Sequence, residues 1–322
     1  MMFCIEVRGV NDLWHRMCPV MVAKAVAEET RNGKAYRFPT PVMIEVREPW
    51  CRVLEDPKRD CNHVFHLMES IWMLAGRNDV AFLDQFNSNM KNFSDNGNQF
   101  NAAYGHRWRN HFGQDQLLKA IERLRTNPTD RRAVINMWDP SDDMFNMTTK
   151  DVPCNLTMIP QVSPDGKLDL LTVNRSNDLV WGLCGANAVH LSMVHEFMTM
   201  ALGLPMGTWR HLSTNLHYYD WHADLVKDTH VQPNYVWQTF PRRQMLLDGT
   251  DAETFLRECG EICDGKQEGF SSPFLEDTVE PVWASWREWK TGDKREAIEI
   301  ASCIESDDWR IGIVHWYKRH IK

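Results

Sequence analysis

The sequence lacks the features that mark several large classes of protein. It has no run of about 18 apolar residues, so no transmembrane helix is expected, and its first residues, MMFCIEVRGVNDLWHR, carry early charges in place of a secretory signal's long apolar stretch. Basic residues are not in excess, because the net charge is −8, which argues against a partner that is a nucleic-acid polymer. No P-loop, dinucleotide-binding glycine motif or nucleophile elbow occurs. We therefore expect a cytoplasmic protein that binds neither a membrane nor a nucleic-acid polymer.

Disulfides and metal sites are equally unsupported. The nine cysteines are scattered, and no CxxC pair occurs, so reduced thiols fit better than a disulfide framework or a zinc ribbon. Two histidine pairs, His63 with His66 and His190 with His195, have the spacing of metal ligands, but no Cys or carboxylate set completes a site. We expect no metal.

What is present is an ordinary globular composition with mixed secondary structure. Of the 322 residues, 43% are hydrophobic and 25% are charged, and neither a repeat nor a linker divides the chain, so we expect one domain over 1–322. Periodicity predicts helices over 63–76, 114–126 and 187–203, and strands over 132–138, 156–162 and 168–174, with two short strands within 34–47. Turn-forming residues predict loops over 86–101, 139–153, 228–248 and 264–281. The strands cluster centrally without regular βαβ alternation, which indicates an α+β fold.

Two residues in these elements suit covalent or acid–base chemistry. Glu69 lies in an apolar helix with Phe65 and Trp72 as its i−4 and i+3 neighbours. A carboxylate at the edge of a buried stripe is costly unless paired, and it suits general acid–base work; pairing with a buried Arg is the simpler alternative. Cys154 lies where a loop enters a predicted strand, so its thiol can be accessible to act as a nucleophile. A small buried hydrophobe is the simpler role for any free Cys, and we assign it to the other eight.

The positions of the arginines indicate more clearly which class of ligand the protein binds. Arg31 lies in a predicted turn, and Arg175 with Ser176 directly follows a predicted strand. Arg131 and Arg132 are adjacent, so they cannot point the same way if they begin a strand. Several arginines and a Ser at loop positions can form a bidentate cradle for a small phosphorylated ligand. Surface salt bridges are the alternative.

Taken in chain order, a series of segments resembles the motifs of the thymidylate synthase superfamily over roughly residues 23–225. The nucleophile motif Pro-Cys-His of that family is similar to PCN at 153–155, and its Arg-Ser-x-Asp motif is similar to NRSNDLVWG at 174–182. The other matching segments are EETRNGKA at 28–35, MESIWMLAGRNDVAFL at 68–83, AYGHRWR at 103–109, DRRAVINMWDP at 130–140 and LHYYDWH at 216–222. Each motif is modest alone, but their common order is specific.

The resemblance implies a fold, two substrates and a covalent mechanism. The fold is thymidylate-synthase-like, with helices packed on a central mixed sheet and one sheet face forming a homodimer interface. The substrates are a pyrimidine nucleoside monophosphate and 5,10-methylenetetrahydrofolate. Cys154 would attack C6 of the base, which turns C5 into an enolate-like carbon that captures the one-carbon unit. Glu69 would order water and move protons, Tyr104 would support proton removal, and Asn155 stands where synthases carry the catalytic His.

The same resemblance assigns the ligand contacts. Arg131 and Arg132 would reach the phosphate from the partner subunit, which explains how two adjacent arginines can both serve one site. Their positive charges would lower the pKa of the Cys154 thiol. The remaining contacts, arranged by ligand, are Arg31, Arg175 and Ser176 for the phosphate, Asn187 for the base, His217 and Tyr219 for the sugar, and Asp178, Gly182, Met90 and Phe93 for the folate.

Departures from the synthase pattern bear on the product. No Trp occurs between Trp72 and Trp108, where synthases place one against the folate, and Met90 or Phe93 stands there. The last residues, DWRIGIVHWYKRHIK, differ from the short apolar tail that closes over the folate in synthases. Without a lid and packed aromatics, water can reach the exocyclic methylene before hydride does. The resemblance is therefore strongest to the (deoxy)nucleotide 5-hydroxymethylases of phages and antibiotic pathways, which would place a phage-encoded enzyme in the host cytoplasm.

The base remains open at the level of sequence. Asn187 offers a donor and an acceptor, which suits uracil N3–H and O4, whereas the cytosine-specific relatives carry Asp. The segment GLCGAN is one residue longer than the synthase pattern, so Ala186 could take the place of Asn187. The best interpretation is a dUMP hydroxymethyltransferase, a one-carbon transferase. The alternatives are a dCMP or CMP hydroxymethylase, a thymidylate synthase, and an inactive regulator that binds nucleotide or RNA.

Overall fold

The largest layer of the structure is a mixed β-sheet. The computed structural model describes residues 2–230, 245 and 251–321. In this part of the chain the sheet has six strands in the order β1-β4-β9-β7-β6-β5; β1 with β4 and β7 with β9 are parallel, and the other pairs are antiparallel. The strands are β1 (Phe3–Val7), β4 (Val42–Val46), β5 (Ile135–Asn136), β6 (Asn155–Val162), β7 (Leu168–Asn174) and β9 (Met206–Ser213). The predicted α+β fold around a central mixed sheet is confirmed.

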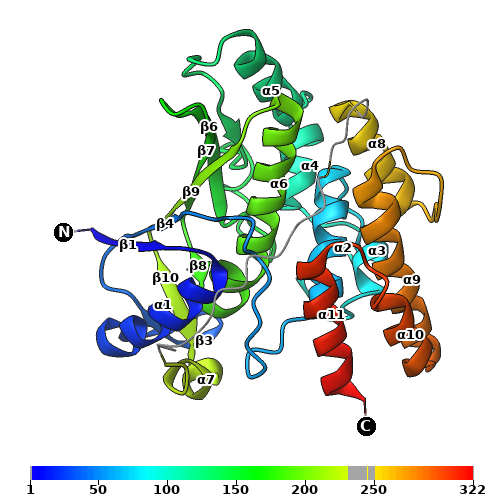
Figure 1. Cartoon of the computed structure of the whole chain (residues 1–322). Helices are drawn as coiled ribbons and strands as arrows, with labels where there is room; N and C mark the ends of the chain where they lie inside the picture. Colours follow the sequence, from blue (N-terminus) through cyan, green and yellow to red (C-terminus); the bar gives the residue numbers. More distant parts are fainter. Residues whose placement is uncertain (1, 231–244, 246–250, 322) are drawn as a thin grey trace.

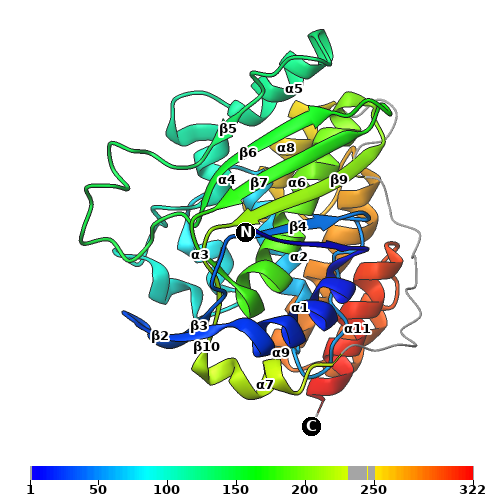
Figure 2. The same ribbon diagram turned by 90° about the vertical axis from the view of Figure 1, so that its left-hand side faces the viewer.

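Helices cover one face of this sheet. The helix α6 (Asn187–Leu202) contacts β7 and β9, and Figure 2, in which the sheet faces the viewer, shows the helices behind it. Side chains alternate to match: Leu170 and Thr172 of β7 are buried, whereas Leu171 and Val173 point to the opposite face and are half-buried. The described part of the chain places no helix over that opposite face, which we call the open face.

A smaller sheet lies at the ends of β7 and β9. Its order is β2-β3-β10-β8, with β2 (Val26–Thr30), β3 (Gly33–Arg37), β8 (Asn177–Asp178) and β10 (Leu216–Tyr219). The turn between β2 and β3 presents Arg31, and Gly33 closes it at a φ of 100°, in the left-handed region that favours glycine. The sequence predicted two strands within 34–47, which are β3 and β4, but not this second sheet, because β8 and β10 are too short to show a period.

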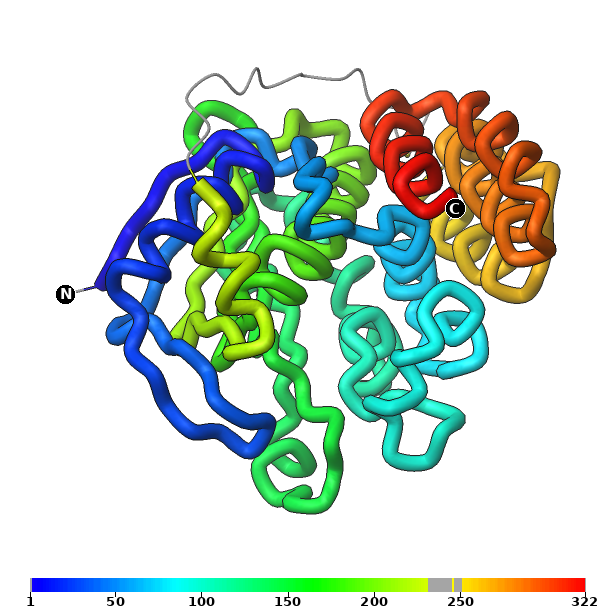
Figure 3. The backbone as a smooth tube through the Cα atoms, turned by 90° about the horizontal axis from the view of Figure 1, so that it is seen from below, coloured from blue at the N-terminus to red at the C-terminus, as the bar shows by residue number. Residues whose placement is uncertain are grey.

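The helix that carries Glu69, α2 (His63–Leu74), is enclosed on several sides. It contacts α6 and the C-terminal helices α8 (Ala252–Cys263), α9 (Glu280–Thr291) and α11 (Asp307–His320), and α10 (Lys294–Ala301) packs on α9. Figures 1 and 3 show these helices, coloured orange to red, on the side of α2 away from the large sheet. This enclosure explains why α2 is apolar nearly throughout, since a helix buried all round needs no polar face.

Most predicted elements are found, with corrections at their ends. The predicted helices 63–76, 114–126 and 187–203 correspond to α2, α5 (Gln116–Thr126) and α6. The predicted strand 132–138 is reduced to β5, because the backbone N–H of Arg132 bonds Asp130 in a turn. The predicted loop 264–281 is wrong in its second half, where the helical turn η5 (Leu275–Val279) leads into α9, whose early Pro suits a first helical turn.

The remaining segments are short. The predicted loop 139–153 carries no helix or strand, whereas 86–101 contains the 3₁₀ turn η1 (Met90–Phe93). The predicted loop 228–248 lies almost entirely outside the described residues. In the described ranges, no helix has the length and apolarity needed to cross a membrane. The other helical elements are the long helix α1 (Val10–Lys24) and the short α3 (Val80–Asp84), α4 (Tyr104–His106), η2 (Arg107–His111), η3 (Leu179–Ala186), η4 (Asp220–His222) and α7 (Ala223–Lys227).

Candidate active site

Two adjoining cavities bring together residues from α2, α6 and the smaller sheet. The smaller cavity, of about 260 Å³, is lined from α2, η1 and α6, and the larger, of about 670 Å³, is lined by the β2–β3 turn, the loop before β6 and the ends of β8 and β10. Both are lined by Phe93, Ala102, Tyr104 and Asp151. Because they share these walls, the cavities form two parts of one cleft.

The larger cavity holds a thiol beside two arginines. Cys154 lines it together with Arg31, Arg175 and Ser176. The Arg175 guanidinium is fixed above the loop that leads to the thiol, since its Nε donates to the Pro153 carbonyl at 2.9 Å and its Nη2 to the Val152 carbonyl at 3.1 Å. The structure thus joins a nucleophile candidate to a site that can bind an anion.

Burial dominates the electrostatics of this thiol. Burial raises the pKa of Cys154, and the carboxylates of Asp151 and Asp178 raise it further, whereas Arg175 and Arg31 act to lower it. The effect of Arg131 and Arg132 from a partner subunit on the pKa of Cys154 stays a prediction. Within one chain, Arg175 and Arg31 act to lower this pKa, but desolvation of the thiolate outweighs them.

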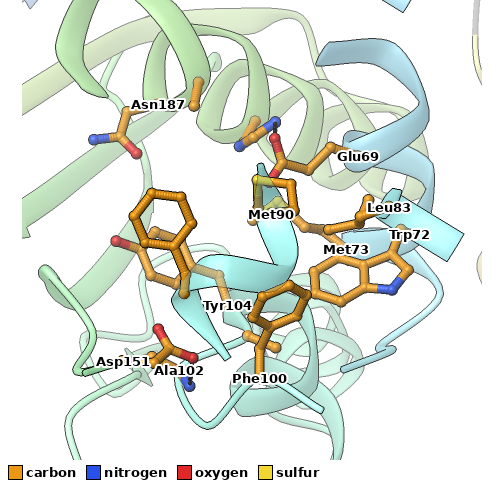
Figure 4. A pocket seen from close by; sticks show the side chains of 14 residues that line it. Glu69, Trp72, Met73, Leu83, Met90, Phe100, Ala102, Tyr104, Asp151 and Asn187 are labelled. Atoms are coloured by element: carbon orange, nitrogen blue, oxygen red, sulfur yellow. Dashed lines mark hydrogen bonds and ion pairs between the residues drawn. The ribbon is translucent and has the colours of Figure 1, made fainter. Parts of the chain in front are cut away.

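The smaller cavity presents a carboxylate among apolar walls (Figure 4). Glu69 is the only residue of α2 that is not buried, because it faces this cavity. Its Oε2 lies 3.1 Å from His190 Nε2, so its neighbour is a His of α6 and not the buried Arg considered from the sequence. Trp72 and Phe100 meet edge to face at 5.9 Å between ring centres and form the wall beside it.

Tyr104 stands where the two cavities meet. Its hydroxyl accepts the backbone N–H of Asn155 at 3.3 Å, and burial raises the pKa of that hydroxyl. Asn187 lines the smaller cavity, whereas His217 and Tyr219 line the larger one. The Tyr219 hydroxyl accepts from Asn32 Nδ2 at 3.1 Å, which ties β10 to the turn that carries Arg31.

The residues predicted for folate are distributed over the cleft. Met90 and Phe93, both on η1, line the smaller cavity, and Asp178 lines the larger one. One oxygen of Asp178 caps η3 by accepting the Val180 N–H at 2.7 Å, and Oδ2 is buried without a hydrogen-bond partner among the described residues. Gly182 lines neither cavity.

Other predicted residues are not in the cleft. Arg131 and Arg132 are exposed and line neither cavity of their own chain, and Arg132 pairs with Asp130 at 3.1 Å. Asn155 is fully buried and donates from Nδ2 to Asn174 Oδ1 at 2.8 Å, so its side chain lines neither cavity. The catalytic role of Asn155 and the phosphate role of the paired arginines stay predictions.

Sequence reasoning missed several lining residues. Trp72 and His190 each follow a predicted site residue by three positions on a helix, and this spacing places them on the same helical face, so their position was available from the sequence. Phe100 and Asp151 lie in loops, where no period indicates which side chains turn inward. Because Trp72 lines the cavity, the absence of Trp between positions 72 and 108 does not leave this cleft without one.

Comparison with known proteins agrees with the fold and the motif order. The model of the thymidylate synthase family matches residues 51–258. A deoxyuridylate hydroxymethyltransferase of Pseudomonas phage M6 is 36% identical over 98% of this chain and 93% of its own length, and one of Bacillus phage SP01 is 41% identical over 61% of this chain and 54% of its own. The crystal structure of thymidylate synthase from T4 phage superposes with a TM-score of 0.63 at 18% identity, over 76% of this chain and 90% of that one. The chain belongs to the thymidylate synthase family.

Proposed function

We propose that the protein is a folate-dependent hydroxymethyltransferase that converts dUMP to 5-hydroxymethyl-dUMP. The observation that carries the proposal is the joined cleft, in which the Cys154 thiol and the Glu69 carboxylate face two cavities that meet at Tyr104. A base held there would be reached by a nucleophile from one side and by a general acid–base group from the other. The named activity of the phage M6 and SP01 relatives supports the choice of reaction.

The larger cavity is the proposed nucleotide site. Arg31, Arg175 and Ser176 would bind the 5′-phosphate, and a bound dianion would stand beside the thiol. His217 and Tyr219 would contact the sugar. The remaining proposed contacts are Asn187 for the base edge, Tyr104 at the reacting carbon, and Arg131 and Arg132 from the partner subunit. Asn155 would act behind Tyr104, because its backbone N–H donates to the Tyr104 hydroxyl.

The smaller cavity and its rim fit a folate. Flat aromatic walls from Trp72, Phe93 and Phe100 suit a pterin ring, and Asp178, which lines the adjoining larger cavity, would accept from the ring's N–H groups. We propose Met90, Phe93, Asp178 and Gly182 as folate contacts. When bound, 5,10-methylenetetrahydrofolate supplies the one-carbon unit at the oxidation level of formaldehyde. Cys154 would form the bond to C6, and Glu69 would hold the water that adds to the transferred carbon.

A thymidylate synthase is the second candidate, and a specific observation favours it. Trp72 and Phe100 place aromatic surface in the smaller cavity, which could keep water from the transferred carbon as a synthase requires. On the other side, no residue beyond Tyr219 in the described part of the chain lines either cavity, so no apolar C-terminal segment covers the cleft there. The two reactions differ in whether hydride or water completes the product.

Product analysis tests the proposal. The protein is incubated with methylenetetrahydrofolate and dUMP, dCMP or CMP, and the nucleotide and folate products are identified by mass and absorbance. We expect dUMP to gain CH₂O with release of tetrahydrofolate. A gain of CH₂ together with dihydrofolate would instead establish a synthase, and preferential conversion of dCMP or CMP would change the substrate. Binding of nucleotide without any turnover would indicate an inactive regulator.

We also propose a homodimer built on the open face of the large sheet. Leu171, Val173 and Leu212 are half-buried there, and Arg210 bridges Asp169 at 2.6 Å and Glu45 at 3.2 Å between them. The buried core of a homodimer interface is more apolar than the rest of a protein surface, and the apolar side chains of this face would supply such a core. The homodimer matters for activity because it would allow Arg131 and Arg132, which line neither cavity of their own chain, to serve the phosphate site of the partner.

A further inference from the structure

A buried polar chain leads away from Asn187 and has no role in the reaction proposed above. Asn187 Nδ2 donates to Asn177 Oδ1 at 3.0 Å. Asn177 Nδ2 lies 2.8 Å from His211 Nε2 and 3.3 Å from Ser213 Oγ. Asn177 is 3% exposed, and His211 and Ser213 are 0% exposed, so water does not compete for these bonds. We call Asn187, Asn177, His211 and Ser213 the amide relay.

The far end of the amide relay fits the direction in which Asn187 donates to Asn177. His211 is neutral, because burial lowers its pKa to about 3, so one ring nitrogen donates and the other accepts. Its Nδ1 lies 2.7 Å from Thr172 Oγ1, which also accepts from Trp209 Nε1 at 2.9 Å. With the proton on Nδ1, His211 Nε2 accepts from Asn177 Nδ2, and Asn177 Oδ1 is left facing Asn187.

The consequence for Asn187 is a fixed orientation of its amide. The nitrogen is held toward Asn177, and Figure 4 shows the oxygen directed toward the cavity. Uracil carries a donor at N3 and an acceptor at C4, whereas cytosine carries an acceptor at N3 and a donor at C4. An amide that could turn over would match either base, but one fixed with its oxygen toward N3 matches uracil alone.

We propose that Asn177 is a positioning residue that makes this site select uracil over cytosine, by holding the Asn187 amide in one orientation. The proposal rests on the proposed function, in which Asn187 reads the base edge. Gly182 is part of the arrangement, because a Cβ there would lie 2.3 Å from Asn177 Oδ1 and would push it from its place. Asn177 acts only through Asn187, since it lines neither cavity.

Two substitutions at position 177 test the relay. In Asn177→Ala the Asn187 amide has no buried acceptor to hold it, so we expect the dUMP-to-dCMP ratio of kcat/KM to fall at least about tenfold, within the range by which a bidentate contact discriminates bases. In Asn177→Asp the oxygen that faces Asn187 still accepts, and His211 can pair with the second oxygen by carrying its proton on Nε2. Asn187 therefore keeps its orientation, and we expect a ratio within about threefold of the unsubstituted protein because the holding bond is retained. Thr199→Ala, which removes a buried hydroxyl at the far end of α6, is the matched control and leaves the ratio unchanged.

The dissociation constants for dUMP and dCMP are measured by calorimetry beside the kinetics. If the unsubstituted protein binds dUMP tightly but makes another product, the proposed reaction fails while the binding ratios still test the relay. Equal ratios in the unsubstituted protein and Asn177→Ala overturn the proposal, as does loss of discrimination in Asn177→Asp. Should Asn177→Ala not fold, His211→Gln replaces it: a Gln amide can meet Asn177 in either orientation, so discrimination should again fall, and an unchanged ratio contradicts the relay.

Discussion

At the scale of single residues, Glu69 shows how an otherwise buried helix can present one carboxylate to the cleft for acid–base chemistry. Every other residue of α2 is buried, and Glu69 alone reaches the cleft. Its Oε2 lies 3.1 Å from His190 Nε2, and the carboxylate faces the smaller cavity, where a water or a substrate can reach it. An amide of the same shape would keep the packing but could not accept a proton.

We therefore expect Glu69→Gln to bind nucleotide normally and to lose turnover by at least about 10²-fold, the usual contribution of a general acid–base group. Steady-state kinetics and nucleotide titration measure the two effects separately. Glu122→Gln, on the exposed face of α5, is the matched control and should keep full activity. A Glu69→Gln variant with near-normal kcat would rule out the acid–base role.

Cys154 provides a test of pH dependence. Its pKa is raised by burial and by Asp151, so the thiolate fraction of the ligand-free protein should keep increasing with pH beyond the usual titration range of a free thiol, about 8.5. The rate of iodoacetamide labelling at Cys154, followed by peptide mapping, should rise in parallel. Asp151→Asn removes a carboxylate that raises the pKa of the thiol and keeps an acceptor for the Ala102 N–H, so its labelling profile should shift to lower pH. A rate that is already constant near neutral pH would contradict this account.

At the scale of elements, the packing of α11 on the start of α2 depends on one small residue. A Cβ at Gly312 would lie 2.7 Å from Val53 Cγ1 and 2.9 Å from His63 Cδ2, so the two segments approach too closely for a side chain. Gly260, within α8, has no atom of the described residues within 4 Å of its Cβ position. Substitution of the two glycines by Ala therefore distinguishes the effect of helix propensity, which acts at both positions, from the effect of close packing, which acts only at Gly312.

We expect Gly260→Ala to stabilise the protein by up to about 1 kcal/mol, because Ala favours the helix over Gly. Gly312→Ala gains the same propensity but must displace buried atoms, which costs roughly 1–3 kcal/mol and should make its net effect destabilising. Urea denaturation of both variants measures the difference. Equal stabilisation by the two substitutions would show that α11 does not pack closely on α2.

The elements that were predicted correctly are long enough for the apolar pattern of a helix or a strand to repeat several times along the sequence. The helices α2, α5 and α6 have repeated apolar positions over three or more turns, and β6 and β7 have a full run of strand residues. The smaller sheet was missed because β8 has two residues and β10 has four, and their pairing is decided by the ends of β7 and β9.

The same distinction applies to the site. Cys154, Glu69 and the arginines could be found because the order of the motifs that carry them is specific, although each motif is modest alone. Asn177 could not, because its role depends on His211 and Ser213, which reach it only after the chain has folded. The side-chain direction of Asn155 was also beyond the sequence, since a buried strand residue can face either side of a sheet.

At the scale of the whole molecule, the open question in the sequence was how Arg131 and Arg132 could serve a phosphate. Both are exposed on the segment that leads into β5, and neither lines the two cavities of the cleft in its own chain. If the open face of the large sheet pairs two copies by a two-fold axis, the arginines of each subunit can enter the cleft of the other. Each active site would then be shared between two chains.

A shared site predicts complementation between inactive variants. Arg131→Glu with Arg132→Glu in one chain and Cys154→Ser in the other should each be inactive alone. In a mixed dimer one site receives an intact Cys154 from the first chain and intact arginines from the second, so random one-to-one mixing should restore about a quarter of the unsubstituted activity, because half of the dimers are mixed and each has one complete site. Cys154→Ser mixed with Glu69→Gln is the control: both residues belong to the cleft of one chain, so no complete site can form and activity should stay at the background. Restoration in the control, or none in the arginine mixture despite mixed dimers, would show that the arginines do not act across the open face.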